Sequence, residues 1–143
     1  MRNYILFGLL ILVFGSKSLA LDEESVNLEA LTKTQNLLKD AEQRNGVVKE
    51  SDGAKKADDV VGTVSMGDAD AKNSIYGIAA DVMPWLVSQT NGDPVKMFEL
   101  LEKAKNDPKA FLSSLPEAER RKIRNLGNYL DSKRSPASAS PSP

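Results

Sequence analysis

The stretch DPVKMFELLEKAKNDPKAFLSSLPEAERRKIRNLGNYL, residues 93–130, decides the fold because its prolines divide it into three short helices. Asp93 and Asp107 each precede a proline. An aspartate can cap a helix through its carboxylate, and proline fits the first helical position. Pro116 is predicted to begin the third helix.

Apolar residues recur at helical spacing in each of these segments, so one face of each helix should be buried. The residues expected to face inward are Val95, Phe98 and Leu101, broadened by Met97, Leu100 and Ala104; then Phe111, Leu112 and Leu115; then Ile123, Leu126, Tyr129 and Leu130.

A longer helix is predicted before this stretch, over residues 69–90, with Asp68 as its N-cap and Asn91-Gly92 as its end. Its inward face is expected to be Ile75, Ile78, Ala79, Val82 and Leu86. Pro84 lies inside this helix. Because proline has no backbone N–H and crowds the preceding turn, it should kink or split the helix near Val82-Met83.

The region before residue 69 is predicted to be one helix and a connector. Residues 22–45 begin with acidic side chains, carry a leucine stripe and end at Asn45-Gly46, which favours a helix. This helix could dock on the rest of the chain, pair with a second copy or bind a partner. Residues 46–68 alternate glycine with polar residues and are predicted to be flexible.

The predicted fold class is all-α. Residues 69–131 should form a small bundle of three or four short helices, with the helix of residues 22–45 separate from it. Residues 132–143 contain serine, proline and alanine without a large apolar side chain, so they are predicted to be a disordered tail.

Residues 1–20 match a secretory signal peptide. Arg2 supplies the positive end, residues 5–14 are apolar, and Ser18-Leu19-Ala20 provides small residues for cleavage. We expect cleavage near Ala20, which places the mature chain in a periplasm or outside the cell.

Composition argues against several classes of chemistry. The chain has no cysteine and no histidine, so it lacks thiol chemistry, the commonest general base and the commonest metal ligand. Removal of Arg2 and Lys17 with the leader leaves 17 basic and 20 acidic residues, a net charge of −3. We therefore expect no enzyme activity, no catalytic residue, no cofactor, no metal and no nucleic-acid partner.

Two groups of residues are predicted to contact a partner. The first comprises Leu28, Leu31 and Leu38 of the leucine stripe together with Trp85, which follows the helix-breaking proline. The second and weaker group is a basic surface of Arg120, Arg121 and Arg124, for which a solvated helix face is the simpler interpretation. Membrane contact is expected only through the signal peptide or weakly through this basic face.

These features predict a small exported, non-enzymatic protein that acts through protein–protein contacts. The alternative is a periplasmic holdase or envelope-stress protein that binds exposed apolar segments. A holdase of this kind could form a homodimer through the N-terminal helix.

Overall fold

The computed structural model describes residues 28–134, and within this range the chain forms seven α-helices and no strand. The helices are α2 (Leu28–Lys39), α3 (Ala41–Glu50), α4 (Asp52–Val64), α5 (Ala69–Thr90), α6 (Pro94–Asn106), α7 (Pro108–Ser114) and α8 (Glu117–Arg134). The predicted all-α class is confirmed. The predicted signal peptide and residues 135–143 of the predicted tail lie outside the described residues. Residues 132–134, predicted to begin that tail, are instead helical and belong to α8.

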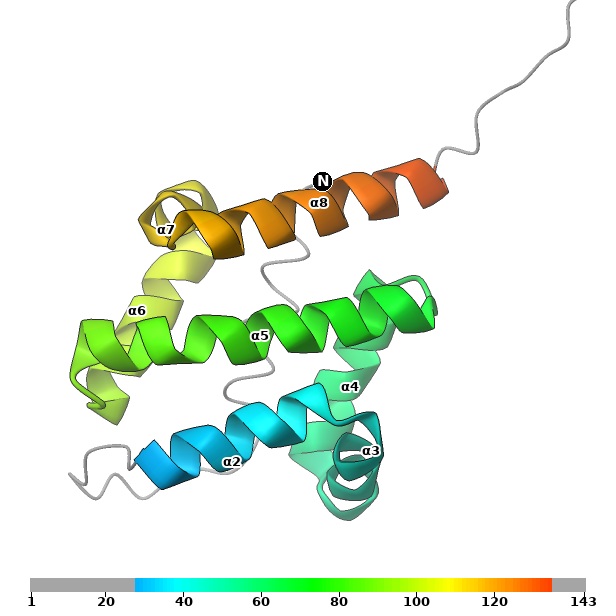
Figure 1. The fold of residues 1–143 in the computed structure, drawn as a ribbon, viewed down its shortest axis with the longest axis horizontal. Helices are drawn as coiled ribbons and strands as arrows, with labels where there is room; N and C mark the ends of the chain where they lie inside the picture. The colour runs from blue at the N-terminus through cyan, green and yellow to red at the C-terminus, as the bar shows by residue number, and fades with distance from the viewer. Residues whose placement is uncertain (1–27, 135–143) are drawn as a thin grey trace, which may run out of the picture.

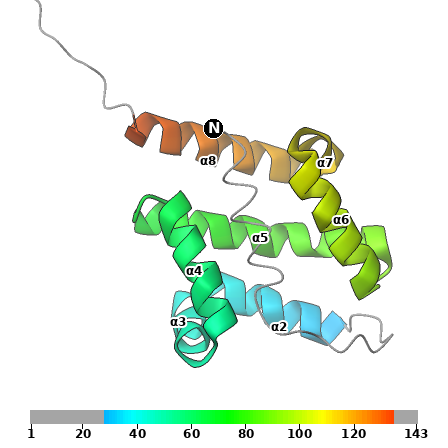
Figure 2. The ribbon, with the colours of Figure 1, turned by 180° about the vertical axis from the view of Figure 1, so that it is seen from behind.

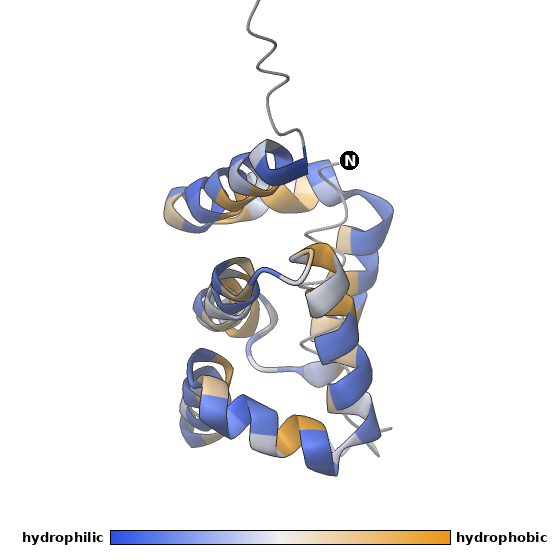
Figure 3. Cartoon of the chain, turned by 90° about the vertical axis from the view of Figure 1, so that its right-hand side faces the viewer, coloured by the Kyte–Doolittle hydropathy of each residue, from blue (hydrophilic) through white to orange (hydrophobic). Residues whose placement is uncertain are grey.

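The central element is α5, which lies between α2 and α8 (Figure 1). These three helices lie side by side and run in alternating directions. The other helices lie behind them, α3 and α4 linking α2 to α5, and α6 and α7 linking α5 to α8 (Figure 2). Seen from the side, α2, α5 and α8 are stacked in one column and the linking helices lie beside it (Figure 3).

The core is centred on α5, because this helix has neighbours on several sides. Its buried residues are Ala71, Ile75, Tyr76, Ile78, Ala79, Ala80, Val82, Leu86 and Thr90. All five residues of the predicted inward face are in this set. The buried side chains Phe111, Leu115, Ile123, Leu126 and Leu130 join the same cluster, as predicted for α7 and α8.

The N-terminal helix is not separate from the bundle, which corrects the predicted arrangement. Leu31 and Leu38 of α2 are buried, and α2 packs along α5. The single helix predicted over residues 22–45 also breaks at Asp40, whose carboxylate accepts the N–H groups of Glu42 and Gln43 and caps α3. From there α3 continues past the predicted stop at Asn45-Gly46 to Glu50.

Residues 46–68 are largely helical rather than a flexible connector, which is a second correction. Ser51 accepts the N–H of Ala54 and caps α4. Ala57 and Val61, four residues apart, are buried on one face of α4. Their burial outweighs the low helix propensity of the glycines, because most helical stability in proteins comes from packing of an apolar face.

The inward faces of α6 and α8 differ in part from the prediction. Val95 and Phe98 are 47% and 55% exposed, whereas Met97, Leu101 and Ala104 are buried. Both sets fit a helical period, so the spacing alone did not distinguish them. Tyr129, predicted to face inward, is 37% exposed.

The predicted helix caps are confirmed. Asp68, Asp93 and Asp107 each accept backbone N–H groups at the start of α5, α6 and α7. Asn91 ends α5 in the left-handed conformation, with a φ of 53°.

Pro84 does not split α5, which runs unbroken from Ala69 to Thr90. A proline at position 84 cannot donate to the carbonyl of Ala80, four residues earlier. The side chain of Gln35 in α2 supplies the missing donor, because its Nε2 lies 2.9 Å from the Ala80 oxygen. The predicted split was wrong because this donor comes from a helix 45 residues away in sequence.

We predict that Gln35→Leu lowers the free energy of unfolding by about 1–2 kcal/mol, because it leaves a buried carbonyl without this donor. In a Pro84→Ala background the loss should be smaller, since the new amide can donate to the same carbonyl. Urea denaturation of the four proteins of this cycle measures the coupling. Equal losses in both backgrounds would contradict the proposed role of Gln35.

Candidate functional site

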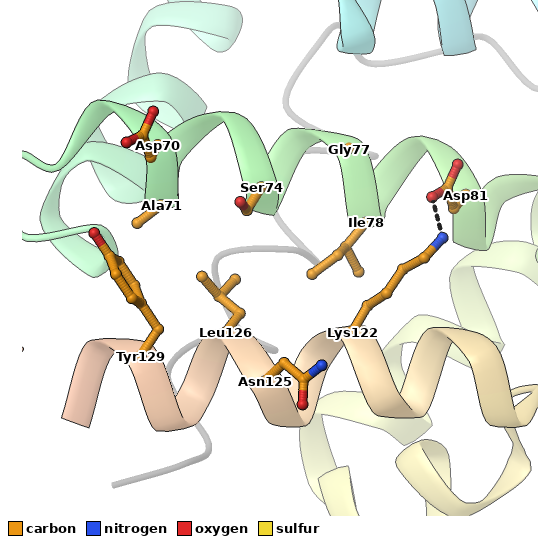
Figure 4. A pocket seen from close by; sticks show the side chains of 10 residues that line it. All are labelled: Asp70, Ala71, Ser74, Gly77, Ile78, Asp81, Lys122, Asn125, Leu126 and Tyr129. Carbon is orange, nitrogen blue, oxygen red and sulfur yellow. Dashed lines mark hydrogen bonds and ion pairs between the residues drawn. The ribbon is translucent and has the colours of Figure 1, made fainter. Parts of the chain in front are cut away.

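A groove of about 500 Å³ runs between α5 and α8 (Figure 4). From α5 it is lined by Asp70, Ala71, Ser74, Gly77, Ile78 and Asp81; from α8 it is lined by Lys122, Asn125, Leu126 and Tyr129. Its volume falls within the range of about 300–1,000 Å³ typical of ligand sites.

Helical periodicity explains why these residues meet. The six positions on α5 recur three or four residues apart or are adjacent to such positions, so they share one side of that helix. The four on α8 follow the same rule. Ala71, Ile78 and Leu126 are buried and form an apolar floor, and the polar residues lie around it.

One end of the groove is closed by an ion pair between Asp81 and Lys122, with 2.6 Å between Oδ2 and Nζ. The other carboxylate oxygen of Asp81 lies 2.8 Å from Nζ of Lys39 in α2. Burial alone would raise the pKa of Asp81, but hydrogen bonds from Lys122 and Lys39 outweigh it and lower this pKa. Asp81 of α5 therefore links this helix to both α2 and α8.

The other end is closed at Asp68, just before α5. Its Oδ2 accepts the hydroxyl of Tyr129 at 2.9 Å and lies 3.2 Å from Nζ of Lys133. Its Oδ1 accepts the N–H of Ala71 at 2.8 Å. The hydrogen bond from Ala71, followed by those from Tyr129 and Lys133, lowers the pKa of Asp68 to about 2.

The middle of the groove is open. A Cβ atom built on Gly77 would meet no other atom within 4 Å, so no packing partner occupies this position. The side chains of Asp70, Ser74 and Asn125 are exposed and make no hydrogen bond or ion pair within residues 28–134. These three side chains can exchange hydrogen bonds with a bound molecule, and Asp70 can pair with a cation.

The groups in the groove provide contacts and not an activated nucleophile. Ser74 has no histidine to take its proton, and Nζ of Lys122 is held by Asp81. Within residues 28–134, no three carboxylates come together in a way that could hold a metal ion. None of the helices in this range combines the length and apolar character that a membrane span requires.

The residues predicted to contact a partner do not form one surface. Leu31 and Leu38 are buried in the chain, at 6% and 7% exposure, and the side chain of Leu28 lies outside the described residues. Trp85 is half-buried and packs edge-on against Phe111 of α7, with 5.8 Å between ring centres. Burial within the chain thus accounts for Leu31 and Leu38, two of the leucines predicted to contact a partner.

The predicted basic surface is also divided. Arg120 is half-buried and pairs with Glu117, with 2.6 Å between Nη2 and Oε2. Arg121 and Arg124 are exposed on α8. Their exposure agrees with a solvated helix face, the simpler interpretation of this basic run.

A polar cluster that was not predicted joins α3, α4 and α5. The guanidinium of Arg44 donates to the Leu38 carbonyl and to Oδ1 of Asn73, both at 2.5 Å, and lies 4.2 Å from the ring centre of Tyr76. The Tyr76 hydroxyl donates to Asp58 at 2.7 Å. Arg44 thereby satisfies a carbonyl in the last turn of α2, which would otherwise lack a helical partner.

The electrostatics of this cluster favour a charged Asp58 and a neutral Tyr76. Burial raises the pKa of Asp58, but hydrogen bonds from Lys72 and Tyr76 outweigh it and lower this pKa. Burial and the hydrogen bond to Asp58 raise the pKa of Tyr76. These groups are all engaged with one another, so the cluster supports the fold and leaves the α5–α8 groove as the candidate site.

Comparison of the chain with protein family models, curated proteins and solved structures finds no match. The α5–α8 groove is therefore the feature of the chain that bears on its function. A signal for it exists in the sequence, because Asp70, Ser74, Gly77 and Asp81 place small and polar residues along one side of an otherwise apolar helix.

We predict that Asp68→Asn lowers stability at neutral pH and that this difference becomes smaller in acid. The pKa of Asp68 is depressed to about 2, so its contribution is fully present above the unfolded-state value near 3.8 and is lost as the pH falls through about 2. Asparagine keeps a capping oxygen but not the charge that pairs with Lys133. Urea unfolding between pH 7 and pH 2.5 measures the difference, and a constant difference across this range would contradict the prediction.

We predict that Gly77→Ala raises the free energy of unfolding by about 0.5–1 kcal/mol, because glycine in a helix interior is less favourable than alanine by this amount. The open space at Gly77 admits the added methyl group. Thermal and urea unfolding check the prediction, with Gly62→Ala in α4 as a matched control in equally open space. Destabilisation by Gly77→Ala alone would show that the groove closes in solution.

Proposed function

We propose that this chain is an exported, non-enzymatic protein that acts by binding another protein, in a periplasm or outside the cell. The observation that supports this function is the α5–α8 groove. It combines an apolar floor with exposed polar groups that make no hydrogen bond or ion pair within residues 28–134. An apolar surface surrounded by polar groups is typical of a binding site.

The groove suits binding because its shape is fixed before a partner arrives. The ion pair of Asp81 with Lys122 and the hydrogen bond of Tyr129 with Asp68 hold α5 and α8 at both ends. A preformed site loses less conformational entropy on binding than one that must be ordered.

Export rests on residues 1–20, and its test is independent of the groove. We predict that the protein recovered from the cells that make it begins at Leu21, because Ser18 and Ala20 supply the small residues that cleavage requires. N-terminal sequencing and intact mass measurement of the fractionated protein check this. Recovery of the full-length chain from the cytoplasm would contradict export.

Binding through the groove can be tested by site-specific photocrosslinking in the native compartment. A photoreactive amino acid at Ser74 should capture one discrete partner, because this exposed side chain lies inside the groove. The matched control is the same amino acid at Ser113 of α7, which is exposed and does not line the groove. Mass spectrometry of the adduct identifies the partner.

The crosslink should disappear when Gly77→Leu fills the groove, while the fold is retained. The same adducts from Ser74 and Ser113 would indicate non-specific capture. No adduct from Ser74 in the native compartment would contradict the proposed function.

A holdase remains the alternative function, and the exposed apolar side chains of Val95 and Phe98 on α6 favour it. Neighbouring exposed apolar side chains can bind unfolded segments without a fixed partner. Under this alternative, Val95→Ser with Phe98→Ser would abolish suppression of a client protein's aggregation, and Gly77→Leu would leave it unchanged.

A further inference from the structure

Among the charged side chains that line the α5–α8 groove, Asp70 alone has no ion-pair partner within residues 28–134. Asp68 and Asp81 are paired with lysines, and the single lysine that lines the groove, Lys122, is held by Asp81. Asp70, at the rim near Tyr129, is exposed and makes no ion pair within residues 28–134. A bound segment therefore gains from a positive charge near Asp70 and loses from a negative one.

The dimensions and floor of the groove favour an extended segment over a helix. From Asp70 to Asp81 the groove is about 16 Å long, at about 1.5 Å per helical residue. An extended chain of about five residues covers this length, at about 3.3 Å per residue. The buried apolar floor comprises Ala71, Ile78 and Leu126, which is little surface for the apolar face of a helix.

The polar groups along the walls also fit an extended backbone. Ser74 lies on α5 and Asn125 lies on α8, on opposite sides of the groove. The serine hydroxyl and the asparagine amide each donate and accept hydrogen bonds, so they can pair with the N–H and carbonyl groups of a peptide between them. At Gly77 the absent side chain leaves room for the peptide to approach α5 closely.

We infer that the α5–α8 groove binds an extended segment of the partner protein, an inference that rests on the proposed function. In this segment a lysine or arginine lies opposite Asp70, and small residues lie over Gly77. The aliphatic stem of the basic side chain packs near Tyr129, and its charge pairs with the Asp70 carboxylate. The basic residue sets the orientation of the segment, and the small residues allow it to lie close to the floor.

The test uses the mature protein and three eight-residue peptides with blocked ends. Each alternates serine and alanine and has arginine, glutamine or glutamate at its fourth position. Titration followed by amide chemical shifts in ¹H–¹⁵N spectra should show the arginine peptide shifting Ser74, Gly77 and Asn125. We expect binding to be about 1.5- to fivefold weaker for the glutamine peptide, as for loss of one exposed charge pair, and weaker still for the glutamate peptide.

Two variants connect this preference to the groove. Asp70→Asn should lower the affinity for the arginine peptide to that for the glutamine peptide. It should leave the affinity for the glutamine peptide unchanged. Its matched control is Asp131→Asn, an exposed aspartate of α8 that does not line the groove, which should change neither. Gly77→Leu should abolish binding of all three peptides. Thermal unfolding of Gly77→Leu and Gly77→Ala shows whether each variant keeps its fold, and so separates a loss of binding from a loss of stability.

Several results would overturn the inference. The first is the absence of chemical-shift changes at millimolar peptide, and the second is equal affinity for the arginine and glutamate peptides. The third is a set of shifts confined to residues outside the groove. The fourth is a set of shifts that depend on protein concentration without peptide, because these would reveal a second copy of the chain in the groove. A Ser74 crosslink together with no charge preference would overturn this inference alone. Charge-selective peptide binding without any native crosslink would overturn the proposed function instead.

Discussion

A hydrogen bond from another helix satisfies the carbonyl that Pro84 leaves without its usual donor in α5. Pro84 cannot donate to the Ala80 carbonyl, and Nε2 of Gln35 donates to it at 2.9 Å. Because Gln35 belongs to α2, this contact also joins α2 to α5. The core is centred on α5, and the helices on both of its sides take their positions from it.

Carboxylates of α5 and its flanks join the surrounding helices to this central one. Asp81 pairs with a lysine from α2 and another from α8, and Asp68 joins the start of α5 to the last turns of α8. Asp58 of α4 receives hydrogen bonds from Lys72 and Tyr76 of α5. Where α5 faces α8, the pairs stand at the two ends and small residues lie between them, so the middle of this interface remains a groove.

The candidate site could be predicted from the sequence only in part. Large apolar residues such as Leu31 and Trp85 were the strongest contact signals, yet the core provides partners for both of them. The groove is built from small and polar residues whose individual signals are weak. It exists only where α5 and α8 lie against each other, and the polar contacts between these helices at its ends join residues 41 or more positions apart.

The sequence by itself determined where α5, α6 and α7 begin. Asp68, Asp93 and Asp107 accept backbone N–H groups within three residues, so these starts are local and can be recognised from the residues alone. The tertiary structure alone decided that residues 46–64 are largely helical, that Met97 rather than Phe98 faces inward, and that α5 passes through Pro84. These outcomes depend on burial and on donors supplied by distant segments, which no local pattern contains.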